Sequence, residues 1–464
     1  MKTDDLLAAH FPDLPLVRRE PKARAHIREH NEKADTRLVV LDDDPTGCQT
    51  VHDIEVLTAW PAGRIRQMLS SEHCFYILTN SRALPVDEAS QLNTEIAVLL
   101  KKNASPESLR IVSRSDSTLR GHFPAETDAL TEILGPYDGI VVVPYFREGG
   151  RITVNSTHYV LQDRKLVEAA RTEFAQDSIF GFKNSFLPAW IREKSQGRWR
   201  ESDVLNVDLK TIRSGGPEAV AQCLREARDM TPVVLNALCD SDLEVAVLGL
   251  CQAEAQGKRF LYRTAASFVK IRAGIEDVPL YRPTEGAGPG LIVVGSHVQR
   301  TTEQLEALLQ IGNLDPFMVR IAEVLGKDAP ALQVRLKERI GAALATKRSV
   351  VVYTEREYAV SGSDKERLRD GQRISDFLVD LVAGLDQRPG FIIAKGGITS
   401  CDIAVKALDV QQATVLGQIL PGIPVWRLGH ESRYPGIDYV VFPGNVGDRQ
   451  GLVTAFKAFA FPSP

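Results

Sequence analysis

Short runs of apolar, mostly β-branched residues alternate along this chain with segments whose apolar residues recur every three or four positions. The runs are short and apolar throughout, which is typical of strands buried on both faces of a sheet. The segments between them predict amphipathic helices. The segment 86–102 is an example, with Leu92 and Ile96 on one apolar stripe. Strands that alternate with helices indicate a mostly parallel sheet covered by helices.

The predicted elements form two groups, separated by a segment without periodicity. In the first group the predicted strands are 38–42, 54–58, 74–79, 109–113, 139–144, 203–208, 232–237 and 259–264. In the second group the predicted strands are 291–294, 349–353, 391–394 and 438–442, and the predicted helices are 301–311, 329–346, 373–384 and 400–409. The segment between the groups is rich in proline and glycine, which is typical of a linker.

The chain has 464 residues, which is longer than a domain with a single hydrophobic core usually is, so we expect two domains. The fold class we predict is α/β, with each domain a mostly parallel sheet flanked by helices. The boundaries we predict are an irregular or partly helical extension at 1–36, a first domain at 37–276, a linker at 277–290 and a second domain at 291–464.

Composition narrows the kind of protein further. With 60 acidic and 56 basic residues the net charge is −4, which gives no electrostatic reason to bind nucleic acid. We find no apolar run of about 18 residues and no secretory signal, so we expect no membrane partner. The six cysteines form no Cys-x-x-Cys pair, which favours reduced thiols. We therefore expect a soluble cytoplasmic enzyme.

Three consecutive carboxylates follow the first predicted strand, in the stretch Asp42-Asp43-Asp44-Pro45-Thr46-Gly47. Proline cannot donate to a sheet ladder, so the strand must end here. In an open α/β sheet, ligands bind just beyond the carboxyl ends of the strands. The stretch is therefore either a ligand site or an ordinary acidic turn.

Three further predicted strands of this domain also end in polar residues. One is followed by Ser113–Gly121, which contains Asp116 and Arg120, and the others by Arg82 and by Arg151. If these strands lie in one parallel sheet, the polar segments that follow them would meet at one edge and form a pocket that suits a small polyhydroxylated anion. Arginine would bind its carboxylate, and Asp, Ser and Thr its hydroxyls. By themselves, Ser117 and Thr118 are also consistent with a helix cap, and each arginine with a surface ion pair, so the inference rests on their convergence.

Small-residue loops follow the predicted strands of the second domain. They are Gly295-Ser296, Lys395-Gly396-Gly397-Ile398-Thr399-Ser400 and Pro443–Asp448. Glycines let the backbone approach a ligand closely, and helix N-termini offer free N–H groups to phosphate. Neither a Walker A loop nor a Gly-x-Gly-x-x-Gly motif is present, so the residues by themselves indicate only a phosphate-bearing ligand.

These motifs resemble those of the four-carbon acid sugar kinase family. Asp43-Asp44-Pro45-Thr46-Gly47 and Asp116-Ser117-Thr118-Leu119-Arg120-Gly121 resemble the two specific motifs of its N-terminal half. Asn80-Ser81-Arg82, Gly150-Arg151, Gly295-Ser296, Gly396-Gly397-x-Thr399 and Gly444-x-x-Gly447 also match, in order along the chain. The resemblance implies a substrate domain followed by a nucleotide domain, and ATP-dependent phosphorylation of threonate, erythronate or a 3-oxo-tetronate.

Site roles follow from this resemblance and from the chemistry of phosphoryl transfer, which needs positioning and charge neutralisation. Asp43 is the leading candidate for the base that takes the proton of the terminal hydroxyl, or for the residue that orients this hydroxyl, and Asp44 is the alternative. The expected substrate-binding residues are Arg82, Asp116, Ser117, Thr118, Arg120 and Arg151. The expected nucleotide-binding residues are Ser296, Gly396, Gly397, Ile398, Thr399, Gly444 and Gly447. Mg²⁺ would arrive with ATP, and we assign it no protein ligand.

Two other functions are compatible with the same residues. One is an aldolase or dehydratase that acts on sugar acids with a metal held by Asp42, Asp43 and Asp44. The other is a non-catalytic ligand-binding or effector protein on the same scaffold. Neither would couple sugar-acid binding to ATP turnover. For a two-domain metabolic enzyme, a homodimer is the expected assembly.

Overall fold

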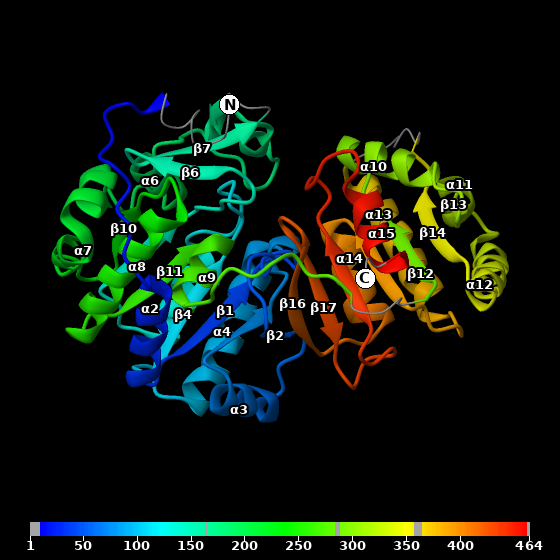
Figure 1. Cartoon of the computed structure of the whole chain (residues 1–464), viewed down its shortest axis with the longest axis horizontal. Helices are drawn as coiled ribbons and strands as arrows, with labels where there is room; N and C mark the ends of the chain where they lie inside the picture. The colour runs from blue at the N-terminus through cyan, green and yellow to red at the C-terminus, as the bar shows by residue number, and fades with distance from the viewer. Residues whose placement is uncertain (1–9, 163–164, 284–287, 357–363, 462–464) are drawn as a thin grey trace. The chain divides into compact units, whose positions relative to one another are not determined.

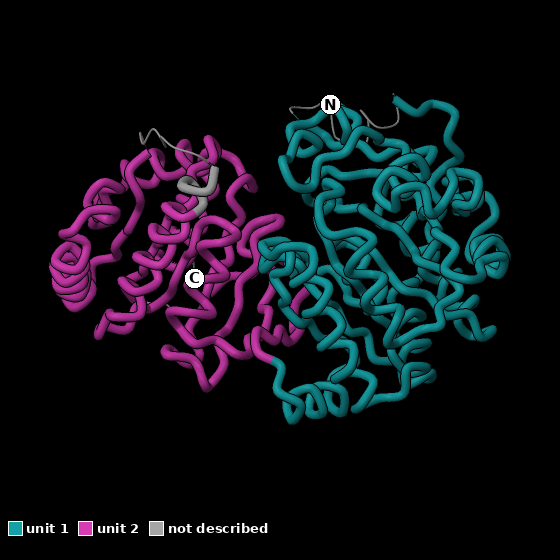
Figure 2. The backbone as a smooth tube through the Cα atoms, turned by 180° about the vertical axis from the view of Figure 1, so that it is seen from behind, with its two compact units in different colours: residues 1–50, 60–277 teal, residues 51–59, 278–464 magenta. Residues whose placement is uncertain are grey.

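The structure is a computed structural model, and it describes residues 10–162, 165–283, 288–356 and 364–461. The backbone divides into two compact units, coloured separately in Figure 2. Unit 1 consists of Met1–Thr50 and Trp60–Asp277, and unit 2 of Val51–Ala59 and Val278–Pro464. Within these described ranges, every helix is too short or too polar to cross a membrane.

Seven strands of unit 1 pair in parallel in the order β3-β1-β4-β11-β5-β10-β9. They are β1 (Arg37–Asp42), β3 (Cys74–Leu78), β4 (Leu109–Arg114), β5 (Gly139–Val143), β9 (Leu205–Val207), β10 (Thr231–Leu235) and β11 (Phe260–Thr264). The central strands are buried on both faces, as continuous apolar runs predict. A separate antiparallel sheet contains β6 (Arg151–Val154), β7 (Thr157–Gln162) and β8 (Lys165–Glu168).

The helices of unit 1 surround the strands of the parallel sheet (Figure 1). They are α2 (Ala23–Lys33), α3 (Ala62–Ser71), α4 (Val86–Asn103), α5 (Ala125–Leu134), α6 (Leu187–Lys194), α7 (Gly216–Leu224), α8 (Asp240–Ala255) and α9 (Ala266–Arg272). Helix α2 is the helical part of the predicted extension 1–36, of which residues 1–9 lie outside the described ranges. Arg24 holds α2 on the unit through an ion pair with Glu244, with Nε and Oε1 2.8 Å apart.

Among its described residues, unit 2 contains eight strands in the order β13-β14-β12-β15-β18-β17-β16-β2. They are β2 (Ile54–Leu57), β12 (Gly290–Val294), β13 (Leu314–Val319), β14 (Ser349–Thr354), β15 (Phe391–Lys395), β16 (Gln412–Leu420), β17 (Ile423–Leu428) and β18 (Asp438–Phe442). The first five in the order are parallel, and β17, β16 and β2 pair antiparallel. Both units therefore confirm the predicted α/β class with mostly parallel sheets.

The strand β2 corrects one predicted boundary. We predicted a first domain at 37–276, which contains this strand, but the segment Val51–Ala59 clusters with unit 2. The reason is its partner, because Gln412 of β16 lies opposite Leu57 and the two strands form an antiparallel ladder. The partner follows in sequence more than 350 residues later, so no local pattern could have revealed it.

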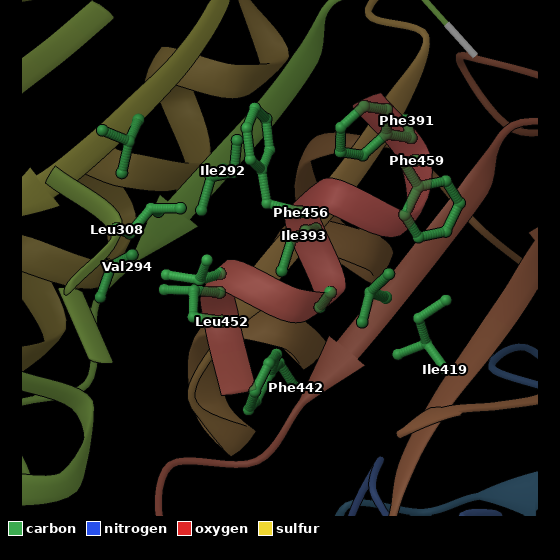
Figure 3. Close-up of a cluster of buried hydrophobic side chains, with 14 of the residues drawn as sticks. Ile292, Val294, Leu308, Phe391, Ile393, Ile419, Phe442, Leu452, Phe456 and Phe459 are labelled. Carbon is green, nitrogen blue, oxygen red and sulfur yellow. The ribbon is translucent and has the colours of Figure 1, made fainter. Parts of the chain in front are cut away.

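Helices α10 and α15 cover the core of unit 2. The helices of the unit are α10 (Gln299–Leu309), α11 (Ile321–Leu325), α12 (Ala329–Ala345), α13 (Asp364–Ala383), α14 (Gly397–Asp402) and α15 (Gly451–Ala460). In Figure 3, Leu452, Phe456 and Phe459 of α15 lie against strand side chains such as Ile292 and Phe391. The rings of Phe391 and Phe459 stack with centroids 4.7 Å apart.

The predicted linker 277–290 packs partly on unit 2, and its residues 284–287 lie outside the described ranges. Tyr281 donates its backbone N–H to the carbonyl of Gln418 at 2.7 Å. Its hydroxyl lies 2.6 Å from a carboxylate oxygen of Asp438. The segment is therefore anchored after it leaves unit 1 at Asp277.

Candidate active site

The carboxylate-rich motifs of unit 1 meet at a reversal of strand order. Strand β1 lies between β3 and β4, and the chain continues from β1 towards β3 but from β4 towards β5. Such a switch point leaves a crevice at the carboxyl ends of the two strands, where α/β proteins bind ligands. Asp42 is the last residue of β1 and lies opposite Arg114, the last residue of β4.

One guanidinium faces two buried carboxylates at this point. Arg114 Nη1 lies 3.1 Å from Asp42 Oδ1 and 2.9 Å from Asp43 Oδ1, and all three side chains are less than 5% exposed. Burial raises the pKa of Asp42 to about 8, since one arginine cannot fully stabilise two charges. Burial also raises the pKa of Asp43. Asp43 Oδ2 is buried without a hydrogen-bond partner among the described residues.

Asp44 differs from its two neighbours in both exposure and charge. Its side chain is 22% exposed, and one oxygen lies 2.5 Å from Arg82 Nη2. The other oxygen accepts the backbone N–H of Thr46 at 2.8 Å and the Thr46 hydroxyl. Burial acts against ionisation, but Arg82 and Arg114 outweigh it and hold the pKa of Asp44 below its ordinary value. Asp44 is thus an ionised and accessible carboxylate.

The turn that carries these carboxylates requires glycine at position 47. A Cβ atom there would lie 2.2 Å from the carboxylate oxygens of Asp42 and 2.3 Å from Arg114 Nε. Any side chain would therefore separate Arg114 from Asp42. This close approach explains why Gly47 ends the acidic motif.

A second polar cluster follows β4. Arg120 Nε lies 2.6 Å from Asp116 Oδ2, to which the Thr118 hydroxyl also donates. Arg82 Nη1 is 3.7 Å from the same carboxylate, so Arg82 contacts both Asp44 and Asp116. Burial opposes ionisation, but Arg120 and Arg82 hold the pKa of Asp116 well below its usual range.

Two of the arginines, Arg120 and Arg151, lie over the same aromatic ring. The guanidinium carbons of Arg120 and Arg151 lie 5.1 and 5.8 Å from the centroid of the Phe174 ring. Arg151 Nε has no hydrogen-bond partner among the described residues. Arg120 already pairs with Asp116 and Asp177, whereas Arg151 forms no ion pair among the described residues. A bound carboxylate would therefore neutralise mainly the charge of Arg151.

In unit 2 the glycine loops also meet at a reversal of strand order. Strand β12 lies between β14 and β15, and the chain continues from β12 towards β13 but from β15 towards β18. The loops after β12, β15 and β18, together with the first turn of helix α14, contain the predicted nucleotide-binding residues. A Cβ atom on Gly444 would lie 3.0 Å from Ser296 Oγ, and one on Gly396 would lie 2.9 Å from Ser296 Cβ. The glycines therefore let the three loops approach one another.

Hydrogen bonds hold these loops from the adjacent helix α10. Thr301 Oγ1 donates to the carbonyl of Gly444 at 2.8 Å and lies 3.2 Å from Ser296 Oγ. Gln304 Nε2 donates to the carbonyls of Val446 and Asp448 at 3.0 and 2.7 Å, on both sides of Gly447. Gly447 has a φ of 83°, which favours glycine.

Comparison with known proteins matches both halves of the chain to described domains. Residues 38–272 match the sugar-binding N-terminal domain, and residues 291–452 match the nucleotide-binding C-terminal domain. Together these matches extend over most of the sequence. The protein belongs to the four-carbon acid sugar kinase family.

Curated relatives are similar at moderate identity. A D-threonate kinase of Bordetella bronchiseptica is 25% identical over 418 residues, 88% of this chain and 90% of the relative. A 3-oxo-tetronate kinase of Brucella melitensis is 25% identical over 413 residues, 85% and 90% of the two chains. A D-erythronate kinase of Heliobacterium modesticaldum is 27% identical over 288 residues. That match covers 59% of this chain and 60% of the relative.

Solved structures share the fold. A Haemophilus influenzae protein superposes with a TM-score of 0.63 at 20% identity, covering 91% of this chain and all of that chain. A Salmonella typhimurium protein gives a TM-score of 0.69 at 19% identity, covering 90% and 98%. At this level of sequence identity, the two similarities show the fold of this family member and nothing about its function.

The predicted site residues of this acid sugar kinase fall into two sets. In unit 1, ion pairs connect Asp43, Asp44, Arg82, Asp116 and Arg120, Thr118 bonds to Asp116, and Arg151 shares Phe174 with Arg120. Ser117 contributes its carbonyl, which lies 2.7 Å from His158 Nε2. In unit 2, Ser296, Gly396, Gly444 and Gly447 lie in the three loops. Gly397, Ile398 and Thr399 lie in the first turn of helix α14, and the Ile398 side chain is exposed.

Sequence reasoning missed several charged residues around these sets. In unit 1, Arg263 Nη1 lies 2.5 Å from Glu126 Oε2, and both side chains are buried. In unit 2, Lys395 Nζ donates to the carbonyls of Pro443 and Gly444 at 2.5 and 3.2 Å. Burial lowers the pKa of Lys395 to about 6. The sequence could have indicated Lys395, because it is a charged residue at the end of an apolar strand. It could not have indicated Glu126 and Arg263, because their ion pair forms only when the fold brings them together.

Proposed function

We propose that this protein transfers the γ-phosphoryl group of ATP to the terminal hydroxyl of a four-carbon sugar acid. The acid would be of the threonate, erythronate or 3-oxo-tetronate type, as in the relatives named above. The observation that carries the proposal is the cluster of unit 1. There, ion pairs link the ionised, accessible Asp44 through Arg82 and Asp116 to Arg120, which shares the Phe174 ring with Arg151. A sugar acid needs both features, one for its hydroxyl and one for its carboxylate.

Arg120 and Arg151 would bind the substrate carboxylate. Each guanidinium keeps N–H groups for a ligand, and Phe174 restricts how far either can turn. Asp116, Ser117 and Thr118 would contact the hydroxyls of the acid. Arg82 already pairs with Asp44 and Asp116, so it would orient these carboxylates as well as the substrate.

Asp44 is the carboxylate that best fits the role of base. Asp43 was the leading candidate on sequence, but its side chain is only 2% exposed and pairs with Arg114. Asp44 is 22% exposed and ionised at neutral pH. It would accept the proton of the terminal hydroxyl as the bond to phosphorus forms.

ATP would bind at the loops of unit 2, where helix α14 begins at Gly397 and its first backbone N–H groups have no acceptor within the helix. The N–H of Gly396 itself donates to the carbonyl of Phe442 at 2.8 Å. Arg356 suits a phosphate, because its guanidinium donates to the carbonyls of Ser296 and Val294 and forms no ion pair among the described residues. Mg²⁺ would neutralise phosphate charge when bound. Among described residues no group of three His, Cys, Asp or Glu could hold a metal, so phosphates and water would supply most ligands.

The competing reaction classes fit the geometry less well. An aldolase or dehydratase would need Asp42, Asp43 and Asp44 to hold a metal, but Arg82 and Arg114 already pair with them. A non-catalytic binding protein would not need an ionised, accessible carboxylate beside its ligand. We also propose a cytoplasmic location, since all six cysteines are free of disulfides, and a homodimer as the assembly.

The test is turnover with a panel of acids. The protein is incubated with ATP, Mg²⁺ and each of D-threonate, D-erythronate and 3-oxo-tetronates, and ADP release is measured. We expect at least one acid to be phosphorylated, and D44N to lower kcat by about 10²–10⁴-fold with little change in KM for the acid.

The matched variant is D43N, which makes the same change at a buried neighbour. We expect it to retain much more activity than D44N. A larger loss in D43N would return the base role to Asp43. ATP-independent cleavage or dehydration of an acid would instead replace the kinase proposal altogether.

A further inference from the structure

A small pocket in unit 1 adjoins the Asp116–Arg120 pair. Its lining residues come from the loop after β4, the ends of β5 and β11, and helix α6. They are Ser115, Asp116, Leu119, Arg120, Val142, Pro144, Trp190, Arg263 and Thr264. The space inside the pocket, measured for the centre of a water-sized sphere, is about 10 Å³, which is roughly the room that one water molecule needs. It therefore has room for a single oxygen atom, either of a water molecule or of a ligand hydroxyl that enters from the open side.

Two of the lining residues have buried polar atoms without a partner. Thr264 is 1% exposed and Trp190 is 3% exposed. Neither Thr264 Oγ1 nor Trp190 Nε1 has a hydrogen-bond partner among the described residues. A buried donor or acceptor left without a partner is costly, so such atoms usually serve a ligand or an ordered water.

The chemistry of these two atoms is specific. The indole N–H of Trp190 donates only, so it needs an oxygen acceptor. The hydroxyl of Thr264 either donates or accepts. Leu119, Val142 and Pro144 provide apolar contacts beside them. Together these groups suit an oxygen-bearing carbon atom of a ligand, because the polar atoms can bond to the oxygen and the apolar side chains can contact the carbon.

We infer that Thr264 and Trp190 recognise one oxygen-bearing carbon of the sugar acid whose carboxylate end contacts Arg120. This inference rests on the proposed function and adds to it the residues that select among four-carbon acids. Epimeric acids place that oxygen on opposite sides of the carbon. Only one epimer would therefore satisfy both buried atoms, and the other would leave them unpaired.

Thr264 is well placed for this role by its strand. It ends β11, which lies between β4 and β5, and its backbone carbonyl accepts the N–H of Ser115 at 2.8 Å. The loop that carries Asp116 is thus fixed to the same residue. A pocket that binds a substrate hydroxyl in this way discriminates strongly against an analogue without it, because its own polar groups then stay unpaired.

The test compares T264V and W190F with the wild type. Both changes remove one polar atom and keep most of the side-chain volume. Steady-state kinetics are measured for D-threonate, D-erythronate and the deoxy analogues of the preferred acid. For the preferred acid we expect KM to rise about tenfold in each variant, with kcat and the KM for ATP little changed.

The decisive readout is the discrimination between acids. In the variants, the ratio of kcat/KM for the two epimers should fall about tenfold, and at least one deoxy analogue should bind as well as it does to the wild type. The control is W199F, since Trp199 stacks on the same Phe123 as Trp190 but does not line the pocket. We expect W199F to keep the wild-type ratio.

The outcomes separate this inference from the proposed function. If the wild type phosphorylates an acid but T264V and W190F keep its discrimination, the two atoms serve ordered water and the inference is overturned. A uniform loss of activity in W199F as well would show a packing effect and would also overturn it. If the wild type neither binds nor phosphorylates any acid, both proposals fall.

Discussion

At the scale of single residues, the crevice of unit 1 is organised by arginines that share carboxylates. Arg114 pairs with Asp42 and Asp43, and Arg82 pairs with Asp44 and Asp116. Burying a charge is costly unless it is paired, so each arginine both stabilises its carboxylates and fixes their positions. The result is one accessible ionised carboxylate, Asp44, beside two buried ones.

Arg120, one of the two arginines that lie over the Phe174 ring, provides a direct test of carboxylate binding. R120K keeps the charge but loses the planar pair of N–H groups, so we expect KM for the acid to rise about 10- to 100-fold with kcat little changed. The control is R198K, because Arg198 also lies over an aromatic ring and pairs with an aspartate, but on the surface. A fall in kcat without a change in KM would move Arg120 to the transferred phosphoryl group.

The raised pKa of Asp42 predicts a pH dependence of stability. The folded protein keeps this proton up to about pH 8, whereas the unfolded chain loses it near pH 4. Raising the pH between these values therefore favours the unfolded state. The free energy of unfolding should fall by up to about 1.4 kcal/mol per pH unit and level off above pH 8.

The D42N variant measures this contribution, because its amide cannot titrate. Denaturant unfolding of both proteins from pH 5 to 9 should give a steeper loss in the wild type than in D42N. Parallel curves would mean that Asp42 is ionised in the folded protein and that Arg114 fully offsets its burial.

Single residues were predictable where the strand pattern marks them. Asp43, Asp44, Asp116 and Arg120 follow apolar runs, so their location at strand ends could be inferred. The exposure of Asp44 relative to Asp43 could not, because it depends on which arginine each carboxylate meets. His158 was also missed, since it lies in β7 and acquires its contact with Ser117 only through the fold.

At the scale of elements, a substitution in the glycine loops of unit 2 tests whether these loops bind ATP. A Cβ atom on Gly444 would press against Ser296 Oγ, so G444A should displace one loop from the other. We expect KM for ATP to rise about tenfold or more, with KM for the acid unchanged. The control is G312A, where the added methyl group meets no atom within 4 Å. An unchanged KM for ATP in G444A would remove this loop from the nucleotide site.

Elements with continuous apolar runs were predicted well, and those with mixed patterns were missed. Strands such as β12 and β15 are buried throughout and stand out in the sequence. Strand β16 alternates half-buried and buried positions and contains Gly417, so it was not recognised. The small sheet β6–β8 was also missed, because β6 is only four residues long and few positions of β7 and β8 are fully buried.

At the scale of the whole molecule, both units use the same principle. Each brings its polar or glycine-rich loops together where the strand order reverses, between β1 and β4 in unit 1 and between β12 and β15 in unit 2. Alternation of strands and helices predicted the class of each unit. Strand order could not be predicted, because it depends on contacts between residues far apart in sequence, as the transfer of β2 to unit 2 illustrates.

The central claim is a division of labour, with the sugar acid in unit 1 and the nucleotide in unit 2. Carboxylates repel phosphates, whereas free backbone N–H groups attract them, so the two ligands should seek different units. Hydrogen–deuterium exchange with each ligand alone tests this claim. ADP should slow exchange in peptides that contain Ser296 and Gly396–Thr399, and the acid in those that contain Asp44 and Asp116–Arg120. Protection by ADP around Asp44, with none around Gly396, would contradict the account.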